Sequence, residues 1–185
     1  MRTLRQYQKS LTSTLQSADN KMVEQLISQI VKVVKTNKRM FICGNGGSSS
    51  TSDHFAVDLG TGSLIRNSGV RAFSLTSNSS VITAIGNDVN FDSVFAKQIE
   101  LYGESGDLLL VISASGNSTN LIEVIQTAKK KSIFVAALVG FDGGKIQKLV
   151  DLSIHTKSDL NEYGIVEDAH LSIAHYITER VRLEI

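Results

Sequence analysis

Two segments of the sequence leave an apolar run through small residues and then gather several serine hydroxyls. They read FICGNGGSSS, residues 41–50, and LLLVISASGNSTN, residues 108–120. If each segment ends a strand and begins a helix, the free N–H groups and the dipole at the helix start favour an anion, and hydroxyls add donors. Together the segments predict a phosphate site. Its donors would be four serines: Ser48, Ser113, Ser115 and Ser118.

Neither segment has the glycine pattern of a nucleotide site. No GK[ST] follows Gly47, and the spacing G-x-G-x-x-G is absent, so a phosphorylated metabolite is a simpler ligand than a nucleotide. The alternative is that Gly and Ser only permit tight turns and close packing of helix on sheet. Two matching segments after separate strands favour the anion site over this alternative.

Titratable residues follow the first serine segment directly. His54 and Asp58 are four residues apart, so they share one helix face about one turn beyond the serines. They could act together in acid–base chemistry. The alternative is a solvent-facing pair that only stabilises the helix.

The last segment, residues 164–185, has the pattern of a long closing helix with two histidines. His170 lies on its apolar stripe, which predicts a core histidine. His175 lies on the polar face, which makes it the better catalytic candidate, although a histidine there can also be simply solvated. Upstream, Asn87 and Asp88 predict a turn or helix cap, with Asp88 as a binding candidate.

The elements that must position these residues follow from hydrophobic periodicity. Apolar residues at helical spacing predict two amphipathic helices over residues 4–15 and 22–34. Five short apolar runs then alternate with stretches long enough for a helix: MFIC, RAFSL, DLLLVIS, IFVAALV and DLSIH. This alternation predicts an α/β fold with a parallel sheet covered by helices on both faces. Ligands of such sheets bind beyond the carboxyl ends of the strands, where both serine segments lie.

Composition limits the partners. The chain has 185 residues, 42% of them hydrophobic, which predicts a single domain. The chain has a formal charge of +1 and no dense block of basic residues, so neither nucleic acid nor a membrane is implied as a partner. The single cysteine, Cys43, and the absence of a signal peptide or long apolar span favour a cytoplasmic location.

Several motifs resemble, in order, the sugar isomerase (SIS) fold and within it the phosphoheptose isomerases. They read CGNGGS, HFAVDL, TAIGND, GDLLLVISASGNSTN, GFDGGK and the tail pattern E-D-A-H-L-S-I-A-H. The resemblance implies a three-layer αβα sandwich with a five-stranded parallel, flavodoxin-like sheet. It further implies that residues 1–185 form one SIS domain. Residues 1–37 would be N-terminal helices for oligomerisation, and residues 38–185 would form the sandwich. The resemblance also implies a homotetramer with sites between subunits.

The resemblance further implies an enzyme that converts sedoheptulose 7-phosphate into D-glycero-D-manno-heptose 7-phosphate for a bacterial lipopolysaccharide or capsule. Asp58 would be the base and His175 the partner acid. The phosphorylated sugar would be bound by seven residues: Asn45, Gly46, Ser48, Asp88, Ser113, Ser115 and Ser118. No nucleotide cofactor is implied, whereas zinc is a possible ligand of four residues: His54, Asp58, Glu167 and His175. Eight residues of one helix rise about 12 Å, so Glu167 would reach the zinc only from a frayed helix start or from another subunit.

Four positions depart from the family pattern. Asp58 replaces glutamate, Gly62 an arginine, Gly164 an aspartate and Glu167 a glutamine. Two alternatives therefore stay open. One is an isomerase for a different phosphorylated ketose. The other is a non-catalytic SIS module that binds a protein, as in the DnaA initiator-associating protein, which lacks the histidine at the position of His175.

Overall fold

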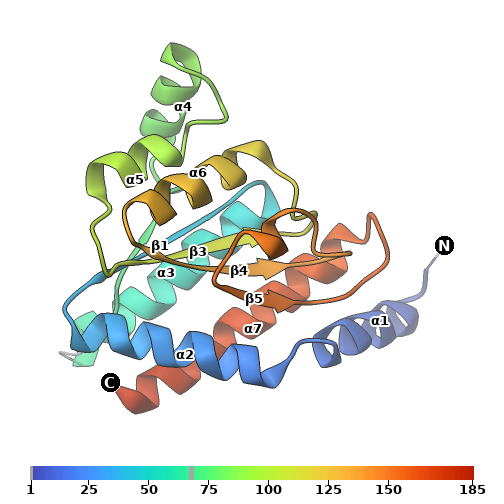
Figure 1. Cartoon of the computed structure of the whole chain (residues 1–185). Helices are drawn as coiled ribbons and strands as arrows, with labels where there is room; N and C mark the ends of the chain where they lie inside the picture. The colour runs from blue at the N-terminus through green and yellow to red at the C-terminus, as the bar shows by residue number, and fades with distance from the viewer. Residues whose placement is uncertain (1, 67–68) are drawn as a thin grey trace.

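The computed structural model describes residues 2–66 and 69–185 and has one parallel sheet at its centre. The strand order is β2-β1-β3-β4-β5, with every neighbouring pair parallel (Figure 1). The strands are β1 Arg39–Gly44, β2 Arg71–Ser74, β3 Leu108–Ser113, β4 Phe134–Val139 and β5 Leu152–His155. Each coincides, to within one residue at either end, with one of the five predicted apolar runs, so the predicted α/β class with a five-stranded parallel sheet is confirmed.

Helices cover both faces of this sheet. The α-helices are α1 Leu4–Gln16, α2 Asn20–Lys35, α3 Gly47–Arg66, α4 Ser79–Asp88, α5 Ala96–Tyr102, α6 Thr119–Lys130 and α7 Tyr163–Glu184, and a short 3-10 helix, η1, spans Ile146–Lys148. Successive strand residues point to opposite faces. On β3, for example, Leu108 and Leu110 pack against α2, α3 and α7, whereas Leu109 and Val111 pack against α5 and α6.

The two N-terminal helices differ in their packing. Six residues of α2 are buried, and three of them, Leu26, Ile27 and Ile30, are at most 1% exposed in the core beneath the sheet. Only Thr14 of α1 is buried, and α1 lies along α7 instead. Helix α2 therefore packs in the same layer of helices as α3 and α7, on one face of the sheet.

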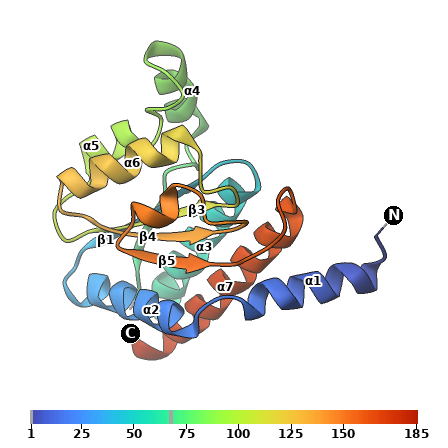
Figure 2. The same ribbon diagram turned by 45° about the vertical axis from the view of Figure 1, so that its right-hand side comes forward.

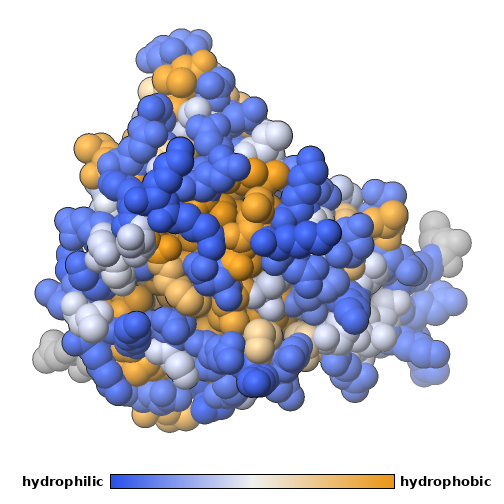
Figure 3. Space-filling model, in the orientation of Figure 1, coloured by the Kyte–Doolittle hydropathy of each residue, from blue (hydrophilic) through white to orange (hydrophobic). Residues whose placement is uncertain are grey.

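Helix α4 projects away from the sheet in both ribbon views (Figures 1 and 2). It has no fully buried residue, and Ile82 and Ile85 are its partly buried contacts with the core under α5 and α6. Figure 3 shows apolar side chains gathered in the middle of the face that carries α6 and β5, surrounded by hydrophilic ones. None of the helices in the described part of the chain has the length and apolar character needed to cross a membrane.

Candidate active site

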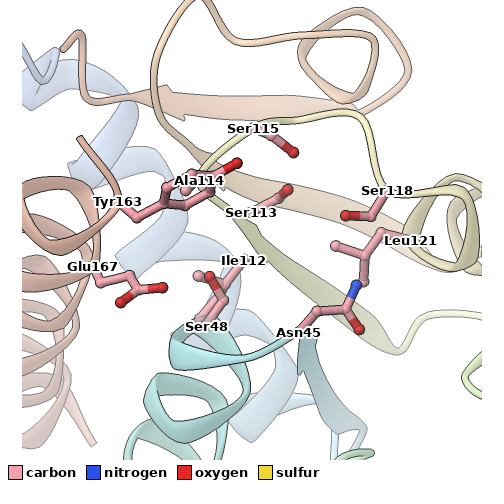
Figure 4. A pocket seen from close by; sticks show the side chains of 10 residues that line it. All are labelled: Asn45, Ser48, Ile112, Ser113, Ala114, Ser115, Ser118, Leu121, Tyr163 and Glu167. Atoms are coloured by element: carbon pink, nitrogen blue, oxygen red, sulfur yellow. The ribbon is translucent and has the colours of Figure 1, made fainter. Parts of the chain in front are cut away.

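The two serine segments enclose a cavity of about 170 Å³ at the carboxyl ends of β1 and β3 (Figure 4). The structure brings all four predicted serines together there. The lining residues are Asn45, Ser48, Ile112, Ser113, Ala114, Ser115, Ser118, Leu121, Tyr163 and Glu167. In Figure 4 the three serines of the second segment lie on one side, with Ser48 and Glu167 opposite.

Two helices begin at this cavity. Gly46, with a φ of +55°, makes the turn between β1 and α3, which starts at Gly47. The second helix, α6, is preceded by Ser118, which has extended backbone geometry and makes no side-chain hydrogen bond to its own helix. The Ser118 hydroxyl thus stays available to a ligand, and both helix dipoles favour negative charge here.

The two loops are tied to each other by amide groups. Asn45 and Asn120 exchange two side-chain hydrogen bonds, each 2.9 Å long. Within the second loop the Ser113 hydroxyl accepts a bond from the N–H of Gly116 at 3.0 Å, and that of Ser115 accepts one from Asn117 at 3.3 Å. The predicted Asn45 therefore serves first as a link between the loops.

A third helix start completes the wall. Helix α7 contributes Glu167 and Tyr163, and the Tyr163 ring packs edge-on against Phe141 at 5.0 Å between centroids. Tyr163 is not among the predicted site residues, because one aromatic residue at the start of a helix carries no distinctive pattern. The Glu167 carboxyl group lies where a side chain on Gly47 would be, so a larger residue at position 47 would displace that carboxyl group. Burial raises the pKa of Glu167, and the negative charge of Asp168 adds to that shift.

Farther along, α3 and α7 bring His54, Asp58 and His175 together. The Nε2 atoms of His54 and His175 are 3.2 Å apart. Asp58 Oδ2 lies 3.3 Å from Nε2 of His54 and 3.8 Å from Nε2 of His175. The histidine side chains are about half exposed, at 49% and 48%, and that of Asp58 is 27% exposed, so a ligand can reach all three.

These three side chains fit a zinc ion by donor type and spacing. Imidazole nitrogen and carboxylate oxygen are ordinary zinc ligands, and bonds of about 2.0–2.1 Å at tetrahedral angles place ligand atoms about 3.4 Å apart. The three donor atoms lie within 4.8 Å of one another. Glu167, the fourth predicted ligand, is not part of this cluster and lines the serine cavity instead. Three ligands with an open position are typical of catalytic zinc.

The cavity and the cluster lie at two levels of one helix pair. Helices α3 and α7 run parallel, because Gly47 contacts Glu167, His54 contacts His175, and Arg182 donates a 2.8 Å hydrogen bond to the carbonyl of Asp58. At 1.5 Å per residue, the seven residues from 47 to 54 and the eight from 167 to 175 correspond to about 10 and 12 Å. Both groups are therefore within reach of one extended ligand.

Other predicted residues lie elsewhere. Asp88 is exposed at the end of α4, where it accepts a 2.8 Å hydrogen bond from Asn87, and it is not a lining residue of the cavity. Gly46 makes the turn beside the cavity without lining it. The surroundings of Gly62 fall outside the described residues. Gly164 leaves room for the Tyr7 hydroxyl, which would be 3.4 Å from an added Cβ.

His170 is a core residue, as its position on the apolar stripe predicts. It is fully buried, and its Nε2 lies 3.0 Å from the Thr156 hydroxyl, while its Nδ1 has no partner among the described residues. Burial lowers the pKa of His170 to about 4, so the ring is neutral at physiological pH.

The strand order β2-β1-β3-β4-β5 between two layers of helices defines a flavodoxin-like α/β protein, and its serine-lined cavity lies at the carboxyl edge where such sheets bind ligands. The pattern of the SIS domain family matches residues 5–140. The chain is 36% identical to the phosphoheptose isomerase of Sulfurimonas denitrificans over 163 residues, which cover 88% of this chain and 83% of the relative. This chain therefore belongs to the SIS domain family and, within it, to the phosphoheptose isomerases.

Solved structures agree with this assignment. The phosphoheptose isomerase of Neisseria gonorrhoeae superimposes with a TM-score of 0.79 at 32% identity, over 87% of this chain and 85% of that one. That of Francisella tularensis superimposes with a TM-score of 0.86 at 26% identity, over 96% and 94% of the two chains.

Proposed function

We propose that this protein is an aldose–ketose isomerase that interconverts sedoheptulose 7-phosphate and D-glycero-D-manno-heptose 7-phosphate. The observation that carries the proposal is the position of Asp58 and His175 on the two helices that also form the serine cavity. One end of the ligand would be held by its phosphate, and the other would lie between a carboxylate and an imidazole.

These two groups suit the chemistry of moving a carbonyl between C2 and C1. One group must take a proton from one carbon and return it to the other, through an enediol, while a second group moves protons on and off the oxygens. Asp58 is the carbon base and His175 the oxygen acid. Because Oδ2 of Asp58 faces both histidines, Oδ1 remains for the proton of the sugar.

The length of a heptose phosphate suits the spacing of the two groups. Three backbone bonds of an extended chain span at most about 3.6 Å, so the eight bonds from C1 to phosphorus span about 10 Å. The six bonds of a pentulose 5-phosphate span about 7 Å on the same scale. The serine cavity and the Asp58 and His175 pair are separated by about 10–12 Å along their helices, which favours the seven-carbon sugar.

Zinc is part of the proposal, with His54, Asp58 and His175 as its ligands in this chain. When bound, the ion would engage Nε2 of His175 and, as a Lewis acid, would polarise the sugar carbonyl in place of the proton that His175 supplies without metal. Glu167 could join such a site only from another subunit, since in its own chain it lines the serine cavity.

We also propose a homotetramer with sites between subunits. Its support is the number of large apolar residues left exposed on the single chain, among them Leu4, Phe73, Phe91, Leu101 and Leu183, together with the apolar patch of Figure 3. The family resemblance adds a role in the synthesis of a bacterial lipopolysaccharide or capsule. A cytoplasmic location belongs to the same proposal, because doubly charged sugar phosphates do not cross a bilayer unaided.

A comparison of ketose phosphates of different length tests the proposed function. Sedoheptulose 7-phosphate, fructose 6-phosphate and ribulose 5-phosphate are incubated with the enzyme, and aldose formation is followed by NMR. We expect kcat/KM to be highest for the heptulose and to fall with each carbon removed. Faster turnover of a shorter ketose would assign the enzyme to a different phosphosugar, and no turnover of any would favour the non-catalytic alternative.

A further inference from the structure

The glycine-rich segment Gly140–Lys145, here called the outer loop, lies directly behind the second serine loop, residues 113–118. None of its residues lines the serine cavity. Gly144 has a φ of +54°, and a Cβ on it would lie 2.5 Å from the carbonyl oxygen of Ser115 and 2.6 Å from that of Gly116. Gly116 in turn faces the carbonyl group of Gly143, which a Cβ on Gly116 would overlap. The two loops are in backbone contact that only glycine permits.

Hydrogen bonds hold the same two loops in register. The N–H of Ile146, just after the outer loop, donates to the Gly116 carbonyl at 2.9 Å. The Asn117 side chain accepts a 3.2 Å bond from the N–H of Lys145 and donates a 2.8 Å bond to the carbonyl of Ser115. The carbonyl groups of Ser115 and Gly116 therefore both accept hydrogen bonds. The Asn117 side chain donates to the first and the N–H of Ile146 to the second.

This arrangement has an electrostatic consequence for an anion. Carbonyl oxygens carry partial negative charge, so a loop that binds phosphate must keep them off the ligand and present N–H and hydroxyl groups. The carbonyls of Ser115 and Gly116 are held toward Gly144, Asn117 and Ile146, none of which lines the cavity. The hydroxyls of Ser115 and Ser118 remain on the cavity side (Figure 4).

From these contacts we infer that the outer loop sets the conformation of the phosphate-binding loop, with Gly144 and Asn117 as positioning residues. The inference rests on the proposed function, since it concerns the phosphate end of the same site. Neither residue needs to touch the substrate. Their effect is on binding of the phosphate group and not on the proton transfers at Asp58 and His175.

The variant Gly144→Asn tests the contact between the loops. Asparagine tolerates a φ near +54° better than other residues with a side chain, so the substitution adds the Cβ overlap with little backbone strain. We expect KM for sedoheptulose 7-phosphate to rise about tenfold, the loss of about one charge-assisted hydrogen bond, with kcat changed less than about twofold. The dissociation constant of inorganic phosphate, measured by calorimetry, should rise by the same factor.

The matched control is Gly106→Asn. Gly106 also has a positive φ, +87°, but it lies in the turn before β3, at the end of that strand remote from the cavity, with Lys38 as its neighbour. A second variant, Asn117→Ala, removes the acceptor for Lys145 and the donor to Ser115 without adding a charge, and we expect KM to rise about threefold. It provides the test if Gly144→Asn does not fold.

The outcomes separate the two proposals. If the wild type isomerises the sugar and the variants at 144 and 117 keep the KM and phosphate affinity of the control, the inference is wrong and the proposed function stands. If the wild type binds phosphate without turnover and Gly144→Asn weakens that binding, the inference stands without the proposed function. A wild type that binds no phosphate and turns over no phosphosugar contradicts both.

Discussion

The carboxyl group of Glu167 lies against Gly47 at the first turn of α3, so an acidic side chain occupies the wall of a cavity built for an anion. Burial and the charge of Asp168 disfavour its charged form there, which raises its pKa. The lining residues include no lysine or arginine to offset the negative charge. Glu167 therefore competes with the ligand for the positive end of α3.

Removing that charge should strengthen phosphate binding. We expect Glu167→Gln to lower KM for the phosphosugar about fivefold near neutral pH, because like charges near a protein surface repel by about 1 kcal/mol. Burial and Asp168 raise the pKa of Glu167, so the charged form prevails only above that raised value. The KM of the wild type should thus rise with pH through this value.

The phosphate group of the substrate also titrates, near pH 6. Its titration affects KM of the wild type and of Glu167→Gln alike, so the variant serves as the control for it. Measured from pH 8 down to pH 5, the ratio of the two KM values should move toward one as the pH falls, because Glu167 loses its charge as the pH approaches its raised pKa. A ratio that is constant over this range would contradict a role for the Glu167 charge.

Zinc binding should depend on His54. We expect the wild type to bind one zinc ion per chain and His54→Ala to bind it at least about a hundredfold more weakly, because one of three ligands is lost. A chelator competition gives the affinities. His155→Ala is the matched control, since His155 hydrogen-bonds the carbonyl of Phe141 at 3.0 Å and is not in the cluster. Equal zinc affinity of His54→Ala and His155→Ala would contradict zinc binding by the cluster that contains His54.

His170 should make the fold sensitive to acid. Burial lowers its pKa to about 4 from an ordinary value of 6.5, so its contribution to stability is complete above about pH 6.5 and is lost as pH falls toward 4. The difference between these two pKa values corresponds to roughly 3 kcal/mol in the free energy of unfolding. The variant His170→Gln keeps a polar group for Thr156 and cannot take this proton. Between pH 7 and 4.5 its free energy of unfolding should therefore fall less than that of the wild type. Urea unfolding at several pH values measures it, and parallel pH profiles would contradict the assignment.

Tyr7 should anchor α1 to α7. Its hydroxyl donates a 2.6 Å hydrogen bond to Asp168, and this bond raises the pKa of Tyr7 to about 12. We expect Tyr7→Phe to lower the free energy of unfolding by about 1 kcal/mol, a small value for a bond to a charged group because the pair is exposed. Tyr102→Phe, at an exposed residue of α5, is the control. If both variants lose the same amount in urea titrations at pH 7.5, the bond contributes nothing.

The sheet was predictable because its three central strands, β1, β3 and β4, are buried on both sides. Runs such as DLLLVIS and IFVAALV place apolar residues on both faces, and only a parallel sheet covered by helices buries both. The four serines were predictable for a related reason, since parallel strands deliver the residues after them to one edge. The spacing of His54 and Asp58 likewise fixes a shared helix face.

Contacts between distant helices were less accessible to sequence reasoning. The position of Glu167 depends on the parallel packing of α7 on α3, which no periodicity specifies. That packing alone places Glu167 in the serine cavity and not in the metal cluster. The Asn45 and Asn120 pair and the contact of Gly144 with the serine loop also join residues with no local pattern. The departure of α4 from the sandwich could not be predicted either, because its apolar residues have ordinary helical spacing.

Isomerisation of sedoheptulose 7-phosphate in deuterium oxide, followed by proton NMR for the wild type and Asp58→Asn, both saturated with zinc, would establish whether Asp58 is the carbon base. We expect product with solvent deuterium at C2 from the wild type, and turnover lowered by about a hundredfold or more in the variant, which keeps the shape of the side chain and loses the base. Product without deuterium, or exchange by Asp58→Asn at the wild-type rate, would contradict this role of Asp58.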